Sequence, residues 1–465
     1  MKFCFKTFGF LFTAVVLFAA VSVSADDVDK YVEAKMAETH VPGVAIAVVK
    51  NGKVVKTKGY GVASVEFGVP VTTKTVFEIG SVSKQITAAA IMLLVEDKKI
   101  DLDDKISKYL KDTPDSWKDV TVRNLLTHTS GIRSYTSIGG FELSKRYKVK
   151  DFIAELSKQP LDFETGSAYK YSNSGYSLLG YIIESASGKT YWEFLRERIY
   201  RPLGMDLTAD RDPKFVIKNR AVGYEWENGH LVGRDYQLTD LFSAGAIVST
   251  VDDLAKWVIA LRDESILTNS SKTESYLPFK LTNGEISNYG LGWNIVDFRG
   301  QHILRHGGQT AGFAANVSQY VDKDISIVVL TNLGTQGLGS AIAQGIAKFY
   351  IPELSLRSLP VTKDADHTIR ATVVEALTHL TDKKPESKIF TDEMIVSLSS
   401  ERMQGVLKRI AKYGRQKNIQ LVEFSREDNK WVYRYLAETP DRLFLWRISV
   451  SEEGRISELT LEEEE

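Results

Sequence analysis

Apolar and polar residues alternate along this chain with two different repeats, one typical of strands and one typical of helices. Residues 44–50 and 53–57 are rich in β-branched residues, and Asn51-Gly52 joins them. That dipeptide is the strongest short hairpin signal because both turn positions need a positive φ. After Ser81 the apolar positions recur at helical spacing in a stretch without Pro or Gly. The pattern predicts that the folded chain begins with a β-hairpin and that a helix begins at Ser81.

The middle of the chain, residues 85–275, mixes helical patterns with loops, and strand patterns follow it. The later strand runs are residues 290–296, 302–305, 316–321 and 325–330, with a turn at 322–324. Because strand patterns lie on both sides of a helical insert, we expect one antiparallel sheet built from both ends of this region. Helices would flank the sheet, a helical lobe would lie beside it, and the functional site would lie between the two. The expected fold class is α+β.

A domain boundary follows near Pro352 to Pro360. Beyond it come an amphipathic helix, a second helix and four strand runs. The apolar positions of the first helix are Ile369, Val373, Leu377 and Leu380, the second helix covers 403–413, and the strands cover 419–425, 430–437, 442–450 and 455–461. We therefore expect a signal peptide at 1–25, a main domain at 26–350, a linker at 351–362 and a small α+β domain at 363–465. The run Glu462 to Glu465 is interpreted as a solvated end.

The first residues have the pattern of a secretory signal peptide. Lys2 and Lys6 precede an uncharged apolar stretch at residues 8–23, and Val23-Ser24-Ala25 supplies small residues suited to cleavage. The alternative is a membrane anchor, but the stretch is shorter than the 18 or more apolar residues expected of a span. We expect export to the periplasm or the extracellular space, with no stable membrane anchor after removal of the signal.

Charge and size narrow the classes of function. The chain has 465 residues, 43% of them hydrophobic, so it can bury a large core and exceeds the usual size of one domain. Lys and Arg number 59 and Asp and Glu number 60, spread along the chain. This balance gives no electrostatic footprint for nucleic acid, so no nucleic-acid partner is expected.

The strongest candidate chemistry is Ser81-Val82-Ser83-Lys84. A serine hydroxyl needs a neighbouring base to attack a carbonyl, and Lys84 falls one helical turn from Ser81 on the same face. The helix N-terminus adds free N–H groups and a positive dipole end. Burial would lower the pKa of Lys84 toward that of a useful base. The alternative is a serine that only caps a helix, and Ser167 with Lys170 repeats the spacing in a segment without a helical pattern.

Two further motifs complete the candidate site. Tyr171-Ser172-Asn173 can supply a phenol that accepts and returns a proton, and an amide that holds Lys84 and a substrate carbonyl. Its alternative is a tyrosine packed in a loop beside a turn-forming Asn.

His306-Gly307-Gly308 ends a strand run, and glycines there suit close approach of a substrate along a strand edge. The backbone N–H groups of Ser81 and Gln309 would then form an oxyanion hole. The alternative is a strand that ends in a glycine turn. His302 and His306 have the spacing of a zinc helix, but Ile303 stands where the zinc enzymes have Glu, so no metal is expected.

These motifs in this order resemble the serine β-lactamase and penicillin-binding-protein-like hydrolases, including class C β-lactamases, R61-type D-Ala-D-Ala carboxypeptidases and family VIII esterases. The resemblance covers about residues 28–350 and includes residues 125–132, 171–176, 202–205, 249–254 and 289–293. It implies that Ser81 is the acylated nucleophile, that Lys84 and Tyr171 are the general base pair, and that Asn173 binds substrate. It also implies that His306, Gly307 and Gly308 line the sheet edge as substrate-binding residues, with no metal or organic cofactor.

The third motif departs from the class C pattern, which has Lys-Thr-Gly where this chain has His306-Gly307-Gly308. Histidine titrates near neutrality, so we expect its charge, and efficient β-lactamase action, to be conditional. Arg305 cannot replace the lysine because neighbouring strand side chains point to opposite faces.

The leading hypothesis is an exported serine hydrolase that cleaves an ester or amide through a Ser81 acyl-enzyme, with a small-molecule or peptide substrate. It would act as an esterase, a D-amino-acid peptidase or a weak β-lactamase. The alternative is a non-catalytic penicillin-binding or sensor protein whose C-terminal domain binds a ligand. That domain, with helices followed by four strands, resembles the NTF2-like cone.

Overall fold

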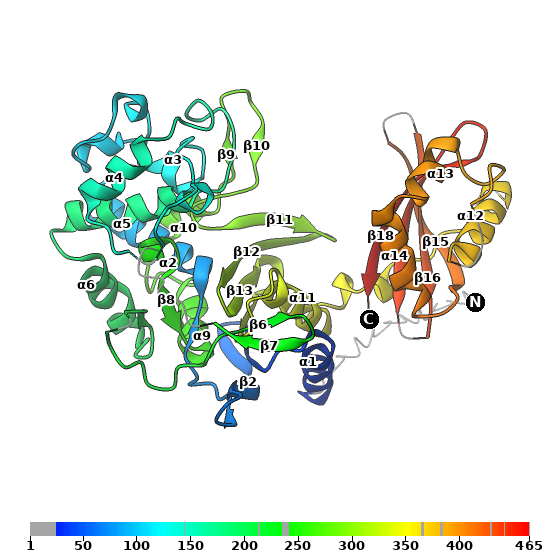
Figure 1. Ribbon diagram of the computed structural model, residues 1–465, viewed down its shortest axis with the longest axis horizontal. Coiled ribbons are helices and arrows are strands. Elements are labelled where there is room, and N and C mark those ends of the chain that lie inside the picture. The colour runs from blue at the N-terminus through cyan, green and yellow to red at the C-terminus, as the bar shows by residue number, and fades with distance from the viewer. Residues whose placement is uncertain are drawn as a thin grey trace, which may run out of the picture.

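The structure is a computed structural model that describes residues 25–143, 145–212, 214–234, 241–363, 367–381, 385–427, 430–440 and 442–464. The expected signal peptide lies outside these residues, apart from Ala25. Within the described ranges, no helix combines the length and apolar character needed to cross a membrane. Figure 1 shows a large body that contains the central sheet and, beyond a short connection, a small body that ends at the C-terminus.

The central sheet is antiparallel and contains seven strands within the described ranges, in the order β11-β12-β13-β14-β1-β2-β3. Their bounds are β1 Gly43–Lys50, β2 Lys53–Ser64, β3 Val69–Pro70, β11 Asn294–Phe298, β12 Gln301–Thr310, β13 Phe313–Tyr320 and β14 Ile325–Thr331. β1 pairs with β14 along its length, so the two ends of the region share one sheet, as the sequence predicts. Asn51 and Gly52 have φ values of 51° and 72°, which confirms the predicted hairpin between β1 and β2.

Two layers of helices enclose this sheet. On one face α11 (Leu338–Tyr350) packs on β13 and β14, and α1 (Ala25–Thr39) packs on α11. Within the described residues, this helix precedes the hairpin, so the expectation that the folded chain begins with a hairpin is wrong. Val28 and Val32, one helical turn apart, are both fully buried against this face, which explains why the segment is helical.

The helical lobe covers the other face, with α9 against β1 and α2 in the centre (Figure 1). Its helices are α2 Ser83–Glu96, α3 Val122–Leu126, α4 Val149–Ser157, α5 Asn173–Ser187, α6 Tyr191–Leu195, α7 Arg201–Leu203, α8 Phe242–Gly245, α9 Val251–Ala260 and α10 Asn269–Ser275. Short strands accompany them at β4 Phe77–Glu78, β5 Ala209–Asp210, β8 Ile247–Ser249, β9 Phe279–Lys280 and β10 Ile286–Ser287. The apolar core of the molecule is largest here, between sheet and lobe. The hairpin of β6 Tyr224–Glu227 and β7 His230–Gly233 packs instead with the core on the side of α1 and α11.

One predicted strand begins later than expected. The Gly290 N–H donates to the Trp293 carbonyl and Gly292 has a φ of 81°, so these residues form a tight turn ahead of β11. That turn places Tyr289 beside the site described below.

The C-terminal domain has a core of its own, separate from the two cores of the main domain. Its described elements are α12 His367–His379, α13 Asp392–Leu398, α14 Glu401–Ala411, β15 Lys417–Glu427, β16 Lys430–Glu438, β17 Leu443–Val450 and β18 Ile456–Glu464. The strands follow each other in one antiparallel sheet, β15-β16-β17-β18, and the helices cover part of one face. The four predicted strands and two predicted helices are confirmed, whereas α13 was not predicted.

The linker between the domains is packed. Leu354 is buried in the core of the main domain, and Leu356 is buried against the sheet of the C-terminal domain. Glu464 accepts hydrogen bonds from the Leu356 N–H at 2.6 Å and the Ser355 hydroxyl at 2.5 Å. It also pairs with Lys348 at 3.1 Å. The interpretation of the glutamate run as a solvated end is therefore wrong for Glu464, which is 7% exposed and holds the linker in place.

Candidate active site

Ser81 lies in a 3-10 turn, Gly80–Val82, that continues directly into α2. The residue at the start of this turn is Ile79, which makes no side-chain cap, so Ser81 does not act as an N-cap. Gly80 has a φ of 50°, and a Cβ on it would lie 2.7 Å from the backbone N of Gln309. Only glycine fits this turn, because the residue needs both a left-handed backbone and close approach to β12. The local geometry presents the Ser81 hydroxyl beside the edge of the sheet.

Lys84 lies one turn further along and is completely buried. Its Nζ lies 3.0 Å from Ser81 Oγ, 2.8 Å from Asn173 Oδ1 and 2.7 Å from the Ala244 carbonyl oxygen. Burial lowers the pKa of Lys84 well below its ordinary value, and no carboxylate among the described residues pairs with it. The structure thus brings Ser81, Lys84 and Asn173 together as the sequence predicts.

Asn173 is held at the start of α5 by its neighbours. The Ser172 hydroxyl caps the helix by accepting from the Gly175 N–H, and it donates to the Ile132 carbonyl. The Asn173 N–H donates to Ser134 Oγ at 3.2 Å. With both neighbours fixed, the Asn173 amide is oriented so that its oxygen faces Lys84 and its NH₂ group is available to another partner.

Tyr171 lies just before this helix, and Lys84 Nζ is 4.8 Å from the centre of the Tyr171 ring. Burial raises the pKa of the Tyr171 phenol, and the nearby Ser81 hydroxyl opposes that rise only in part. The Tyr171 hydroxyl is buried and forms no hydrogen bond with the described residues. The phenol is therefore protonated at neutral pH.

His306 lies on β12 with its ring facing Tyr171 and Tyr289. Its Nε2 accepts from the Tyr289 hydroxyl at 2.8 Å, and its Nδ1 donates to the Gly307 carbonyl at 2.6 Å. Burial, together with the charge of Lys84, lowers the pKa of His306 to about 3. The expectation that His306 titrates near neutrality is wrong, because the ring is 3% exposed and both nitrogens bind neutral partners. Arg305 faces the opposite side of the sheet, as expected, where it lines a hollow with Tyr320.

Side chains added at Gly307 and at Gly308 would point to opposite faces of the sheet. A Cβ on Gly308 would lie 1.9 Å from the Ile79 carbonyl oxygen and 3.1 Å from the Ser81 backbone N. A Cβ on Gly307 would meet Ser340 Oγ at 3.3 Å, on the side of α11. The backbone N–H groups of Ser81 and Gln309 therefore lie at the place where the Ser81 turn touches β12. This arrangement agrees with the predicted oxyanion hole, whose role stays a prediction.

The second serine and lysine pair has a different environment. Ser167 Oγ donates to the Glu164 carbonyl at 2.7 Å, and Lys170 pairs with Asp162 at 2.7 Å. Lys170 is 59% exposed, so its amine is solvated. His302 binds Asp297, and no group of three or more His, Cys, Asp or Glu side chains in the described ranges is placed to hold a metal ion.

The family model of the β-lactamases matches residues 28–348, which is more than half of the chain. The chain belongs to the β-lactamase family. This family fold contains the antiparallel sheet and the helical lobe, and in this β-lactamase-family protein the C-terminal domain follows them.

Two curated relatives agree with this assignment. Protein flp of Staphylococcus aureus (strain COL) is 29% identical over 321 residues, which is 67% of this chain and 64% of the relative. This chain therefore matches just under two thirds of the length of that relative. Penicillin-binding protein 4* of Bacillus subtilis (strain 168) is 28% identical over 318 residues, 64% of this chain and 69% of the relative.

Solved structures extend the likeness. The octameric penicillin-binding protein homologue from Pyrococcus abyssi is 27% identical with a TM-score of 0.63, over 94% of this chain and 95% of that one, so the match includes the C-terminal domain. D-amino acid amidase from Ochrobactrum anthropi is 26% identical with a TM-score of 0.60, over 71% of this chain and 96% of that one.

Three contributors to the site were not predicted as site residues. The Ala244 carbonyl accepts from Lys84, and a backbone carbonyl leaves no signal in a sequence. Tyr289 holds His306, and the buried His128 packs on Tyr171 with ring centres 4.2 Å apart. The last two lie in stretches that carry the family resemblance, which was the only available signal.

The neutral state of His306 gives a pH prediction. Between pH 5.5 and 8.5 the ratio of kcat/KM for an anionic penicillin to that for a neutral p-nitrophenyl ester should stay constant within about twofold, because a histidine with a pKa of about 3 carries no charge in this range. His306→Gln, measured in the same way, should leave the ratio equally flat. A ratio that falls as pH rises through about 6.5, the usual pKa of histidine, would mean that His306 is charged at low pH and binds the carboxylate of the penicillin.

Proposed function

We propose that this protein is an exported serine hydrolase that cleaves an ester or amide through an acyl-enzyme on Ser81. The observation that carries the proposal is the buried Lys84, whose amine contacts Ser81 Oγ, Asn173 Oδ1 and the Ala244 carbonyl. Export is inferred from the leader pattern of residues 1–25.

The hydrogen bonds of Lys84 suggest which group takes the first proton. A neutral amine has two N–H donors and one lone pair. The donors match the acceptors Asn173 Oδ1 and Ala244 O, so the lone pair is left for the Ser81 hydroxyl, 3.0 Å away. Ser81 Oγ would attack the substrate carbonyl carbon while its proton passes to Lys84 Nζ. The carbonyl oxygen, now negative, would accept from the Ser81 and Gln309 N–H groups.

Tyr171 fits the opposite role. Because burial raises the pKa of its phenol, Tyr171 enters the reaction with its proton and is an acid. It would donate that proton to the leaving alcohol or amine as the bond to the carbonyl carbon breaks, and Lys84 would return its proton to Tyr171. Water then attacks the acyl carbon and gives a proton to Lys84, and Lys84 passes that proton to Ser81 Oγ as the bond between Oγ and the acyl carbon breaks. Every proton is returned at the end of the cycle.

The substrate class follows from charge. The imidazole of His306 is neutral and Arg305 faces away, so these residues offer no standing positive charge to a substrate carboxylate. Esters or amides that place no carboxylate beside His306 therefore suit this site better than penicillins do. The likeness to the D-amino acid amidase of Ochrobactrum anthropi supports small amides or peptides as substrates. Within this class the protein would be an esterase or a D-amino-acid peptidase, with weak β-lactamase action.

Labelling tests the proposal. A fluorophosphonate should add to the chain once, and peptide mapping should place the adduct on Ser81, because Ser81 combines a hydroxyl with a buried amine. Ser81→Ala should abolish both the label and hydrolysis of p-nitrophenyl esters, whereas Ser167→Ala should change neither. A label that persists in Ser81→Ala would contradict the assignment. A label on Ser81 without turnover of any ester, amide or penicillin would favour the non-catalytic penicillin-binding alternative.

A further inference from the structure

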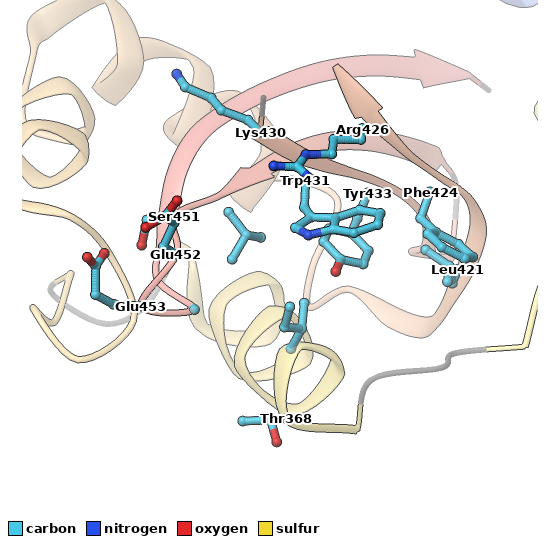
Figure 2. Close-up of a pocket in the computed structure, with 13 residues that line it drawn as sticks. Thr368, Leu421, Phe424, Arg426, Lys430, Trp431, Tyr433, Ser451, Glu452 and Glu453 are labelled. Atoms are coloured by element: carbon cyan, nitrogen blue, oxygen red, sulfur yellow. The ribbon is translucent and has the colours of Figure 1, made fainter. Parts of the chain in front are cut away.

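The C-terminal domain has a groove in the uncovered part of its sheet. The hollow has a volume of about 1110 Å³ and lies between β15, β16, the start of α12 and the turn from β17 to β18. Figure 2 shows Trp431, Tyr433 and Phe424 along its floor, with Arg426 at the edge of the sheet and Thr368 on the opposite side. The groove is far along the chain from Ser81 and is built by a separate core.

A row of aromatic rings leads from the core of this domain into the groove. Tyr435 is fully buried, Tyr433 is 8% exposed, and Phe424 and Trp431 are 43% and 45% exposed. Neighbouring rings lie 6.2 to 6.4 Å apart, and Phe424 stacks on Tyr433 at an interplanar angle of 20°. Two large aromatic faces are thus held in place by buried neighbours while remaining open to solvent. Such rigid, exposed rings offer an apolar ligand contact area at low cost in conformational entropy.

The charges on the two faces of this sheet differ. On the far face Arg434 and Arg447 pair with Glu427 at 3.1 and 2.7 Å. On the groove face Arg426, opposite Trp431 in the strand register, has no ion pair or hydrogen bond with any described residue. Lys430 at the rim is already paired with Glu458 at 2.8 Å. Among the described residues that line the groove, Arg426 is therefore the cation available to a ligand.

Two carboxylates lie at the end of the groove opposite Arg426. Glu452 and Glu453 line the groove at the β17–β18 turn, away from Arg426 in Figure 2. An anion would be repelled from that end and attracted to Arg426, which fixes the direction in which a ligand lies.

We propose that this groove binds a small amphipathic anion. Its planar or apolar body would lie on Trp431 and Phe424, and its single carboxylate, sulfonate or phosphate group would be bound by the Arg426 guanidinium. The guanidinium suits such groups because its N–H donors are planar and can bind two oxygens at once. The proposal concerns the C-terminal domain and does not depend on catalysis at Ser81.

The test uses two fluorescent probes of similar shape on the full chain. 1-Anilinonaphthalene-8-sulfonate carries an aromatic body and one anion, and N-phenyl-1-naphthylamine has the same body without the charge. The sulfonate should bind at one saturable site per chain, with energy transfer from Trp431. Trp431→Ala should weaken both probes by roughly tenfold, since stacking on an aromatic ring contributes about that much. Arg426→Gln should weaken only the sulfonate, by about tenfold, because it removes a charged hydrogen bond.

Matched controls keep the test specific. Trp226→Ala removes a tryptophan that is 40% exposed on β6, and Arg402→Gln removes an exposed arginine on α14. Both should bind the probes as the wild type does, and circular dichroism should show all four variants folded. Sulfonate binding that is unchanged in both Trp431→Ala and Arg426→Gln would overturn the proposal. Self-association in sedimentation velocity that Trp431→Ala abolishes, without saturable probe binding, would mean that a second copy of the chain occupies the groove.

Discussion

Lys84→Met should lower kcat for a p-nitrophenyl ester by roughly 10³-fold, within the range that positioned acid–base catalysis supplies. Methionine has a similar length but no proton to exchange, so Ser81 loses the base that lies 3.0 Å from its hydroxyl. KM should change little because Lys84 Nζ is turned toward protein groups and is fully buried. Steady-state kinetics with burst analysis would show the loss in acylation.

Stability gives a second readout for the same variant. The pKa of Lys84 is lowered by burial, so between that pKa and about 10.4 the unfolded chain binds more protons at this residue than the folded chain. The contribution of Lys84 to stability is therefore unfavourable at low pH, and it improves as pH rises through this window. Lys84→Met lacks this dependence but leaves Asn173 Oδ1 and the Ala244 carbonyl without a donor. The melting temperature of the variant minus that of the wild type should thus decrease as pH rises toward 10.

Lys170→Met is the matched control, since Lys170 occupies the same spacing after Ser167 but is solvated and paired with Asp162. It should keep wild-type kinetics, and its difference in melting temperature should not show the trend of Lys84→Met. Near wild-type turnover in Lys84→Met would remove Lys84 from the base role. A difference in melting temperature that is independent of pH would mean that Lys84 stays charged in the folded protein.

The sequence predicted those features whose cause is local. The hairpin at Asn51-Gly52, the four C-terminal strands and the face shared by Ser81 and Lys84 all follow from backbone preference and periodicity within a few residues. The shared sheet was also predictable, because strand patterns on both sides of a helical insert have few ways to pair. The helix α1 was missed because Val28 and Val32 are the two fully buried residues among its described side chains and its sequence is otherwise largely polar.

The features that escaped prediction depend on contacts between distant segments. His306 was expected to be charged because its residue type titrates near neutrality, but Tyr289 and the Gly307 carbonyl enclose it and burial decides its pKa. Glu464 was interpreted as solvated because it lies in an acidic terminal run. Three groups from the linker and α11 converge on it: the Leu356 N–H, the Ser355 hydroxyl and Lys348. A pattern along one chain cannot contain such partners.

Gly308→Ala should reduce kcat/KM by about 10² to 10³-fold, as expected when an oxyanion donor is lost. The added methyl group would lie 1.9 Å from the Ile79 carbonyl oxygen and 3.1 Å from the Ser81 backbone N. Backbone atoms cannot rotate away as a flexible side chain can, so the Ser81 turn and β12 must separate by an ångström or more. Since the Ser81 and Gln309 N–H groups belong to these two segments, they would no longer point at one oxygen.

The control substitution Gly307→Ala distinguishes displacement of the oxyanion donors from misfolding of β12. A methyl group on Gly307 points to the other face, where its nearest atom is the Ser340 hydroxyl at 3.3 Å, the end of a small side chain. Gly307→Ala should therefore keep kcat/KM within about threefold, since the donors of the oxyanion hole are not displaced. Fluorophosphonate labelling of Ser81 should slow in Gly308→Ala in proportion to ester hydrolysis, because the phosphonyl oxygen needs the same two donors. Equal losses in the two variants would place the defect in the folding of β12, and wild-type rates in Gly308→Ala would show that the oxyanion is stabilised elsewhere.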